Sequence, residues 1–191
     1  FKLDTKLYLG KIGEISIVRH RSIKGKIKTL TIKKSCSGKW YACFSVEQIP
    51  KPKLVSNTFV GIDLGLNHFY ADSDGNLVDN PKYLRKSEER LKLLQRNLSR
   101  KIKGSKNRIK SKLRLNKLHE KISSQRLDFL HKESTKLVNT YLNIAVESLS
   151  IQFMTKNHYL AKSINDVSWN KFLQFLSYKV EETGGKLVEV D

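Results

Sequence analysis

Phe59-Val60-Gly61-Ile62-Asp63 is a short apolar run that ends in a carboxylate, and it decides the fold of the segments around it. Its length and its β-branched residues predict a buried strand. The Gly65-Leu66-Asn67 turn leads into a second strand at about residues 68–71, and Asp74-Gly75-Asn76 turns the chain into a third, shorter strand. Tight turns between short strands predict a three-stranded antiparallel meander.

After the meander the apolar period changes from that of a strand to that of a helix. Apolar residues recur at helical spacing from Leu84 to Ile102, are interrupted by Lys103-Gly104-Ser105-Lys106, and resume from Ile109 to Ile122. Two antiparallel helices are the simplest interpretation. A further helix is expected from about Gln125 to Tyr141.

A second apolar run also ends in an acid. Asn143-Ile144-Ala145-Val146-Glu147 predicts another buried strand. Beyond it, Ser168 or Asp166 is a candidate N-cap for a last helix, because short polar side chains accept hydrogen bonds from the free amides of a first turn. Thr183-Gly184-Gly185 is expected to stop that helix, and residues 186–190 are expected to form a final strand.

Residues 1–53 have the character of an all-β unit. Segments rich in β-branched and aromatic residues lie on both sides of Ser37-Gly38-Lys39, which predicts a hairpin. Pro50-Lys51-Pro52-Lys53 then interrupts any ladder, because proline has no amide hydrogen to donate. We therefore expect two domains, at residues 1–53 and 54–191.

Charge is distributed unevenly along the chain. The net charge is +19, from 37 Lys and Arg against 18 Asp and Glu. Residues 1–57 carry 13 basic and 3 acidic groups, residues 58–81 carry 4 acidic groups and no basic one, and residues 82–132 carry 18 basic and 4 acidic groups. A surface charged only for solubility would not alternate in this way. We expect a polyanionic partner, with residues 82–132 as a basic helical insertion.

The composition excludes several classes of protein. Cys36 and Cys43 are too few for a secreted disulfide framework or for a four-ligand zinc site, and they fit a reduced cytosolic protein. No stretch approaches the ~20 apolar residues that cross a bilayer, so no membrane partner is expected. The chain begins at Phe1 without an initiator Met and ends at Asp191 within a strand pattern, which leads us to expect part of a longer protein.

Asp63 and Glu147 carry the candidate chemistry. Each follows apolar strand residues, and a carboxylate in that place is costly unless it meets a cation. Carboxylates that converge from different strands are the hard oxygen ligands that Mg²⁺ takes in proteins. From the pattern alone, the alternative is that each acid caps its strand or lies in an exposed turn.

Several motifs occur in the order of a known family. Val60-Gly61-Ile62-Asp63-Leu64-Gly65 resembles the first RuvC motif of the TnpB (or OrfB) proteins, relatives of the type V CRISPR effector nucleases. Ile144-Ala145-Val146-Glu147-Ser148-Leu149 resembles their second motif, and Arg126-Leu127-Asp128-Phe129-Leu130-His131-Lys132 is similar to their R-x-D-[FW]-x-H-K helix. Further matches follow in family order at Asp166-Val167-Ser168-Trp169, Gly184-Gly185 and Val188-Glu189-Val190-Asp191. The resemblance covers about residues 55–191, whereas residues 1–50 match the family's β-barrel unit only in character.

The resemblance implies an α/β fold. It would be an RNase H-like (RuvC) domain with the basic insertion at 82–132, preceded by part of an all-β, barrel-like unit. It also implies a metal-dependent, RNA-guided DNA endonuclease of a transposable element, with guide RNA and target DNA as partners. Asp63 and Glu147 would then be catalytic ligands of Mg²⁺, with Mn²⁺ as a substitute, in phosphodiester hydrolysis. A cytoplasmic, nucleoid-associated location in a prokaryote is implied as well.

The sequence departs from the family pattern at its end. The family continues past the last strand into a zinc-binding Cys cluster and then a third acid, and neither occurs here. Zn²⁺ is therefore expected only in that missing segment, and Asp191 is interpreted as a junction residue rather than a ligand. We expect the chain to bind nucleic acid but to cleave it poorly. The alternative is a nuclease-inactive derivative that acts in DNA binding or transcriptional regulation.

The candidate nucleic-acid-binding residues are basic residues of both domains. A merely solvated helix normally mixes charge signs, whereas Glu88, Glu89 and Glu120 are the only acids between Lys82 and Lys121. The candidates in the helical region are Arg85, Arg96, Arg100, Lys101, Arg108, Lys112, Arg114 and Arg126, for the last of which a structural role is the alternative. The candidates in the β unit are Arg19, Arg21, Lys33, Lys34 and Lys39. Trp169, Phe172 and Phe175 are expected to be core residues rather than to stack on bases.

Overall fold

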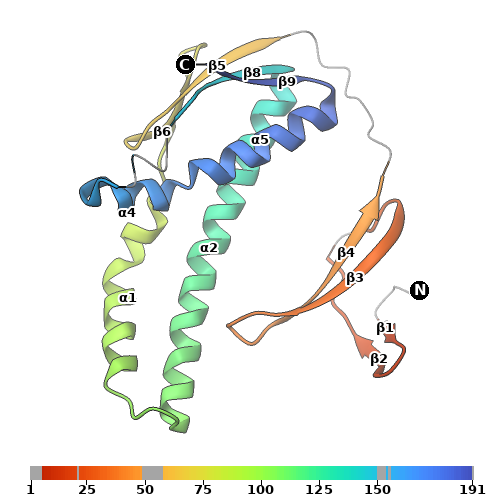
Figure 1. Cartoon of the computed structure of the whole chain (residues 1–191), viewed down its shortest axis with the longest axis vertical. Helices are drawn as coiled ribbons and strands as arrows, with labels where there is room; N and C mark the ends of the chain where they lie inside the picture. Colours follow the sequence, from red (N-terminus) through yellow and green to blue (C-terminus); the bar gives the residue numbers. More distant parts are fainter. Residues whose placement is uncertain (1–5, 21, 49–57, 150–153, 155, 191) are drawn as a thin grey trace. The chain divides into compact units, whose positions relative to one another are not determined.

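The computed structural model describes residues 6–20, 22–48, 58–149, 154 and 156–190. The chain forms two compact units, Phe1–Ile49 and Pro50–Asp191 (Figure 1). The expected linker at residues 50–53 lies outside the described residues.

A mixed five-stranded sheet forms the centre of the second unit (Figure 1). Its strands follow the spatial order β7-β6-β5-β8-β9. The first three along the chain pair antiparallel, as expected of a meander, while β8 and β9 add parallel to β5. The strands are β5 (Phe59–Leu64), β6 (His68–Asp72), β7 (Leu77–Asp79), β8 (Asn143–Glu147) and β9 (Lys186–Val190).

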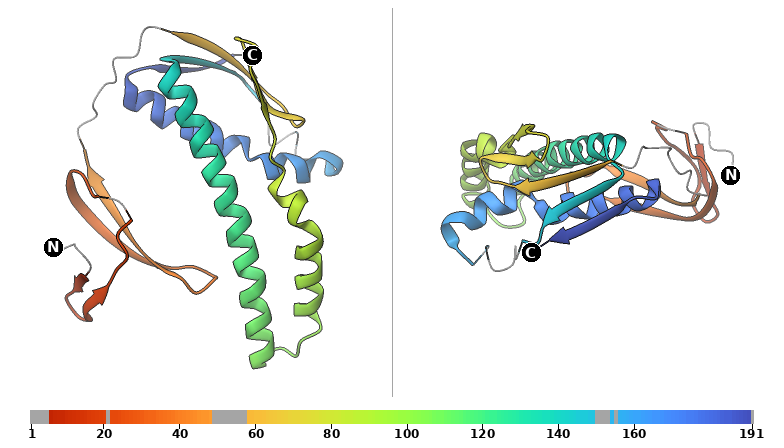
Figure 2. Two further views of the ribbon diagram at one scale, coloured as in Figure 1. Left: turned by 180° about the vertical axis from the view of Figure 1, so that it is seen from behind. Right: turned by 90° about the horizontal axis from the view of Figure 1, so that it is seen from above.

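The helices pack on one face of this sheet, as Figure 2 shows from behind and from above. Val60, Ile62, Ile144 and Val146 point to that face and are at most 4% exposed. They join Leu130 of α2 and the aromatic side of α5 in one core, so the expected burial of Trp169, Phe172 and Phe175 is confirmed. The helices are α1 (Tyr83–Ser99), α2 (Lys106–Thr140), α4 (His158–Val167) and α5 (Trp169–Thr183).

The separate helix expected at 125–141 was wrong, because α2 runs without a break from Lys106 to Thr140. No Gly or Pro occurs in that span, so nothing in the backbone forces an end. Ser105 caps the helix, its Oγ accepting a hydrogen bond of 3.1 Å from the amide of Arg108. At the other end of the domain, the stop expected at Gly184 is confirmed, since Gly184 adopts φ 79° there and ends α5.

Helix α1 and residues 106–122 of α2 form an antiparallel pair that extends away from the sheet, here called the helical arm (Figure 1). Its contact is a small separate core in which Leu91, Leu115 and Ile122 are buried. The two antiparallel basic helices expected in this region are therefore present. Because the core is a single apolar stripe, most of each helix surface faces solvent.

The first unit is all-β but not a closed barrel in its described part. β1 (Lys6–Leu9) pairs with β2 (Gly13–Ser16), and β3 (Lys26–Lys34) pairs with β4 (Trp40–Glu47), as two separate two-stranded sheets. The hairpin expected around Ser37-Gly38-Lys39 is confirmed as β3–β4. A barrel requires each strand to pair on both edges, whereas within residues 6–20 and 22–48 each strand pairs on one edge only.

Candidate functional site

Asp63 and Glu147 occupy neighbouring positions on the two central parallel strands. β5 and β8 pair in register, from Phe59 with Asn143 to Ile62 with Val146. The next aligned position holds the two acids. Neighbouring strands lie about 4.8 Å apart, so the carboxylates project from adjacent points. Both acids are exposed and alternate with the buried Ile62 and Val146, which places them on the same face of the sheet.

This face is the one that the described helices leave open. Ala71 of β6 lies opposite Asp63, and Val190 of β9 lies beside Glu147. None of these neighbours is a cation, and among the described residues neither acid forms an ion pair. Two like charges side by side, with no cation between them, form an arrangement that a divalent ion stabilises.

Two oxygen-donating side chains thus lie at adjacent strand positions, and no third is grouped with them among the described residues. No cluster of three or more His, Cys, Asp or Glu side chains suited to a metal occurs in the part of the chain that the structure describes. Asp191, the residue after Val190, lies outside the described residues. Carboxylate oxygens fit Mg²⁺ or Mn²⁺ by their chemistry, and Mg²⁺ commonly keeps several waters where a protein supplies few ligands.

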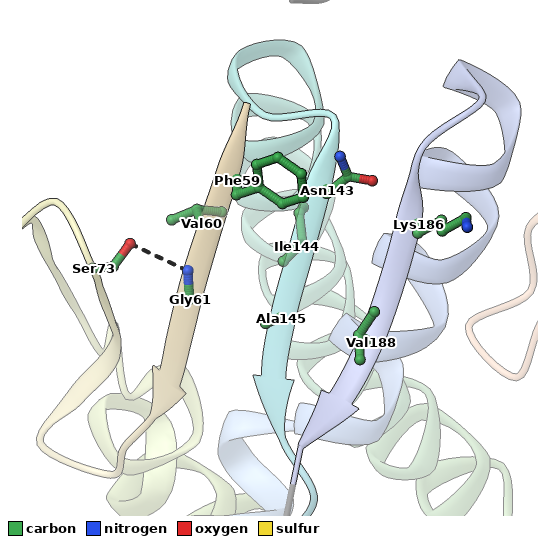
Figure 3. A pocket seen from close by; sticks show the side chains of 9 residues that line it. All are labelled: Phe59, Val60, Gly61, Ser73, Asn143, Ile144, Ala145, Lys186 and Val188. Atoms are coloured by element: carbon green, nitrogen blue, oxygen red, sulfur yellow. Dashed lines mark hydrogen bonds between the residues drawn. The ribbon is translucent and has the colours of Figure 1, made fainter. Parts of the chain in front are cut away.

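A shallow apolar depression lies on the same open face, at the other end of the strands (Figure 3). Its volume is about 300 Å³, and it is bordered by the first residues of β5, β8 and β9. Phe59 is 68% exposed there, and the amide of Gly61 donates a hydrogen bond of 3.2 Å to Ser73 Oγ. The lining contains no acid, so the depression is distinct from the carboxylate pair.

The structure divides the basic candidates of the helical region into two groups. Six of them are exposed and form no ion pair with a described residue: Arg85, Arg96, Arg100, Lys101, Lys112 and Arg114. Arg108 and Arg126 are partly buried instead and bind other parts of the protein. Arg108 Nη1 donates to the carbonyl oxygens of Leu98 and Lys101, at 3.0 and 2.9 Å, and so caps the C-terminal end of α1.

Arg126 takes part in an ion pair that the sequence analysis did not anticipate. Its Nη2 lies 2.7 Å from Asp166 Oδ1, and the two side chains are 23% and 9% exposed. Both carboxylate oxygens of Asp166 also accept a hydrogen bond of 3.2 Å from the amide of Leu84, in the first turn of α1. Asp166 therefore joins α1, α2 and α4, instead of capping the helix that follows it in sequence.

Ser168, the other cap candidate, precedes α5 with φ 60° and forms no side-chain cap. Its hydroxyl instead donates to the carbonyl of Asn165, at 3.0 Å. A second link between α4 and α1 is formed by Glu88, which binds Lys162 of α4 and Lys92 of its own helix, the latter at 2.8 Å. The hydrogen bond from Lys162, and then that from Lys92, lowers the pKa of Glu88 to about 2.

The candidates of the β unit lie on its surface. Arg19, Lys33, Lys34 and Lys39 are exposed, and Arg21 lies outside the described residues. Lys34 Nζ lies 5.0 Å from the ring centroid of Trp40, a residue that the sequence analysis did not single out. Among the described residues, no helix is long and apolar enough to cross a bilayer.

Comparison with known proteins identifies the family. Residues 41–158 match the family model OrfB_IS605, described as "Probable transposase". A "Putative RNA-guided DNA endonuclease" of Streptomyces pristinaespiralis is 36% identical over 85% of this chain and 40% of its own length. The "Putative RNA-guided DNA endonuclease InsQ" of Escherichia coli K12 is 31% identical over 99% of this chain and 52% of its own length.

The chain thus spans about half, or less, of the curated relatives that it matches. Both alignments nevertheless cover more than two thirds of the chain at 30% identity or more, and the family model matches more than half of it. The resemblance to TnpB and OrfB proteins is confirmed: the chain belongs to the OrfB_IS605 "Probable transposase" family.

Proposed function

We propose that this chain is part of an RNA-guided DNA endonuclease of a transposable element. In this proposal, Asp63 and Glu147 are two of the metal ligands of the nuclease centre. The observation that carries the proposal is their alignment on adjacent parallel strands, on the open face of the sheet and without a cationic partner among the described residues. A meander followed by parallel strands with intervening helices fits an RNase H-like (RuvC) domain.

The proposed cofactor is Mg²⁺, with Mn²⁺ as a substitute. The carboxylates of Asp63 and Glu147 would hold such an ion, which would supply charge neutralisation at the phosphate and activation of water in phosphodiester hydrolysis. The protein contributes the positions of the ligands: Ile62 and Val146 anchor the two strands in the core, so the side chains one residue later have little freedom to separate. Zn²⁺ has no proposed place within this chain.

The proposed partners are guide RNA and target DNA. The six exposed cations of the helical arm region provide the surface for their phosphates, because they face solvent and have no carboxylate partner among the described residues. Arg108 supports that surface from within by binding the C-terminal end of α1, and Arg126 does so by pairing with Asp166, which accepts a hydrogen bond from the first turn of α1.

Metal binding tests the first half of the proposal without relying on cleavage. Electron paramagnetic resonance of the free ion measures Mn²⁺ binding. The unchanged chain is expected to bind Mn²⁺. Asp63→Asn and Glu147→Gln are each expected to weaken that binding by about 10-fold or more, because each variant loses one of two charged ligands. Asp79→Asn is the matched control, since Asp79 is an exposed acid of the same sheet that pairs with His68 instead. Equal binding by all variants would refute the proposed site.

Cleavage of labelled DNA tests the second half. The corresponding full-length protein, loaded with guide RNA, is expected to cut in Mg²⁺ and to lose cutting in Asp63→Asn and Glu147→Gln while it still binds DNA. Retained binding with no cutting by the unchanged protein would support the nuclease-inactive alternative instead.

A further inference from the structure

The end of the β3–β4 hairpin combines an exposed aromatic ring with lysines. Lys34 and Trp40 form the last cross-strand pair, directly before the turn. Trp40 is 65% exposed, whereas Trp169, the other tryptophan of the chain, is 2% exposed. Trp40 therefore presents a large aromatic face to solvent, on which another flat ring can stack.

The turn that presents Trp40 is held by several hydrogen bonds. The amide of Ser35 donates to the carbonyl of Lys39 at 2.8 Å, and the amide of Gly38 donates to the carbonyl of Ser35 at 3.0 Å. The hydroxyls of Ser35 and Ser37 lie 2.9 Å apart, and Ser37 is 5% exposed. A turn restrained in this way presents its flanking side chains with little entropy left to lose on binding.

Lysines carry positive charge on both faces of the tip: Lys34 shares the face of Trp40, whereas Lys33, paired with Tyr41, projects from the other face. Lys33, Lys34 and Lys39 are exposed at the same end of the hairpin. Glu47 is the only acid between residues 22 and 48, and it lies at the opposite end, paired with Lys28 at 2.6 Å. The tip is therefore cationic, and its partner should be anionic as well as able to cover an aromatic face.

An apolar protein segment is a poorer occupant of this tip. Trp40 shares its face of the hairpin with Ile32 and Ala42, which another apolar element could cover. Lys34 lies on the same face with its ammonium 5.0 Å from the indole centroid, and a dry contact would strip that charge of water. A nucleobase with its flanking phosphates suits both the indole and the ammonium group, since the base stacks on the ring and the phosphates bind the lysines.

We infer that the tip of the β3–β4 hairpin is a stacking platform for an unpaired nucleobase, with Trp40 as the stacking residue and with Lys34, on the same face, and Lys39, in the turn, as phosphate contacts. The inference rests on the proposed function and adds to it a site for single-stranded nucleic acid. The shared chemistry of RNA and DNA is an unpaired base beside phosphates, and the test distinguishes the two.

Intrinsic fluorescence reports on this site directly. Because Trp169 is buried, the red-shifted emission of the chain arises from Trp40. Titration with oligouridylate or oligothymidylate is expected to quench that emission, and a duplex of the same length is expected to quench it much less. The comparison of the two single strands shows whether RNA or DNA is preferred. Equal quenching by the duplex would overturn the inference.

Affinity is measured in parallel by anisotropy of the labelled single strand. Trp40→Ala is expected to weaken binding roughly 5- to 150-fold, the range for loss of one base–aromatic stack, and Trp40→Phe less. Tyr8→Ala is the matched control, because Tyr8 is a similarly exposed aromatic residue, at 64%, on the other hairpin of the unit. Circular dichroism confirms that the variants are folded.

The two proposals fail in different ways. Binding by anisotropy with unchanged Trp40 emission, and with full affinity in Trp40→Ala, would overturn the stacking platform and leave the arm surface intact. Absence of binding by any single strand or duplex would overturn both. Quenching that follows addition of an apolar peptide but not of nucleic acid would assign the tip to a protein partner and contradict the inference.

Discussion

The helical arm and the sheet that carries Asp63 and Glu147 have charges of opposite sign, yet in both regions some charged side chains are exposed and others are buried and paired. In the arm region, Arg96 and its exposed neighbours face solvent, whereas Arg108 and Arg126 bind carbonyls and a carboxylate. In the sheet domain, Asp63 and Glu147 face solvent, whereas Asp166 is 9% exposed and paired. Charge sign thus identifies the kind of partner, and burial decides whether that partner is the protein itself or something it binds.

The largest expected effect concerns the exposed cations of the helical arm region and the affinity for nucleic acid. If about 6–10 phosphates are neutralised, affinity for nucleic acid should fall by about 10³–10⁵ between 50 and 200 mM salt. Serine in place of the exposed Arg96, Arg100, Lys101 and Lys112 should reduce the slope of log affinity against log salt by about four. An unchanged slope, measured by anisotropy, would mean that these cations are only solvated.

The second expected effect concerns the buried ion pair between Arg126 and Asp166. Asp166→Ala removes the partner of Arg126 and the acceptor for the amide of Leu84, and should cost on the order of 3 kcal/mol of unfolding free energy. Asp128→Ala is the control, because Asp128 pairs with Lys132 on the exposed surface of α2 and should cost less than about 0.5 kcal/mol. Urea denaturation of both variants measures the loss of unfolding free energy. Equal losses of unfolding free energy would contradict the distinction between the buried pair and the exposed pair.

A smaller effect depends on pH. The Lys162 and Lys92 hydrogen bonds lower the pKa of Glu88 from 4.5 to about 2. A lowered folded-state pKa stabilises the fold fully above the ordinary value and loses that stabilisation as pH falls toward the folded one. The stability difference between the unchanged chain and Glu88→Gln should therefore be constant above about pH 5, shrink as the pH falls, and vanish only below about pH 2. A difference that does not shrink between pH 5 and pH 2 would show that the carboxylate charge is not what links α1 to α4.

The smallest effect is expected at the carboxylate pair itself. Without metal, Asp63→Asn and Glu147→Gln should change the unfolding free energy by no more than about 0.5 kcal/mol, because each relieves a like-charge contact and breaks no bond. With Mg²⁺ at about 100 times its dissociation constant, the unchanged chain should gain about 2.7 kcal/mol and the variants much less. A metal-free loss above about 1 kcal/mol would indicate that these acids hold the fold together.

The sequence by itself determined the strands of the central sheet and the positions of Asp63 and Glu147 along them, but not the boundaries of α2. Strand alternation placed Asp63 and Glu147 directly after buried residues, because side chains in a strand point to opposite faces in turn. Gly184 identified the end of α5, since a left-handed residue there favours glycine. These are local properties, set by a few neighbouring residues.

Only the tertiary structure decided which charges are paired and which are free. Arg126 and Asp166 are 40 residues apart, and the amide that Asp166 caps is 82 residues away, so no local pattern could predict either contact. Such outcomes depend on which helix covers which face of the sheet, because burial is a property of the packed domain and not of the residue.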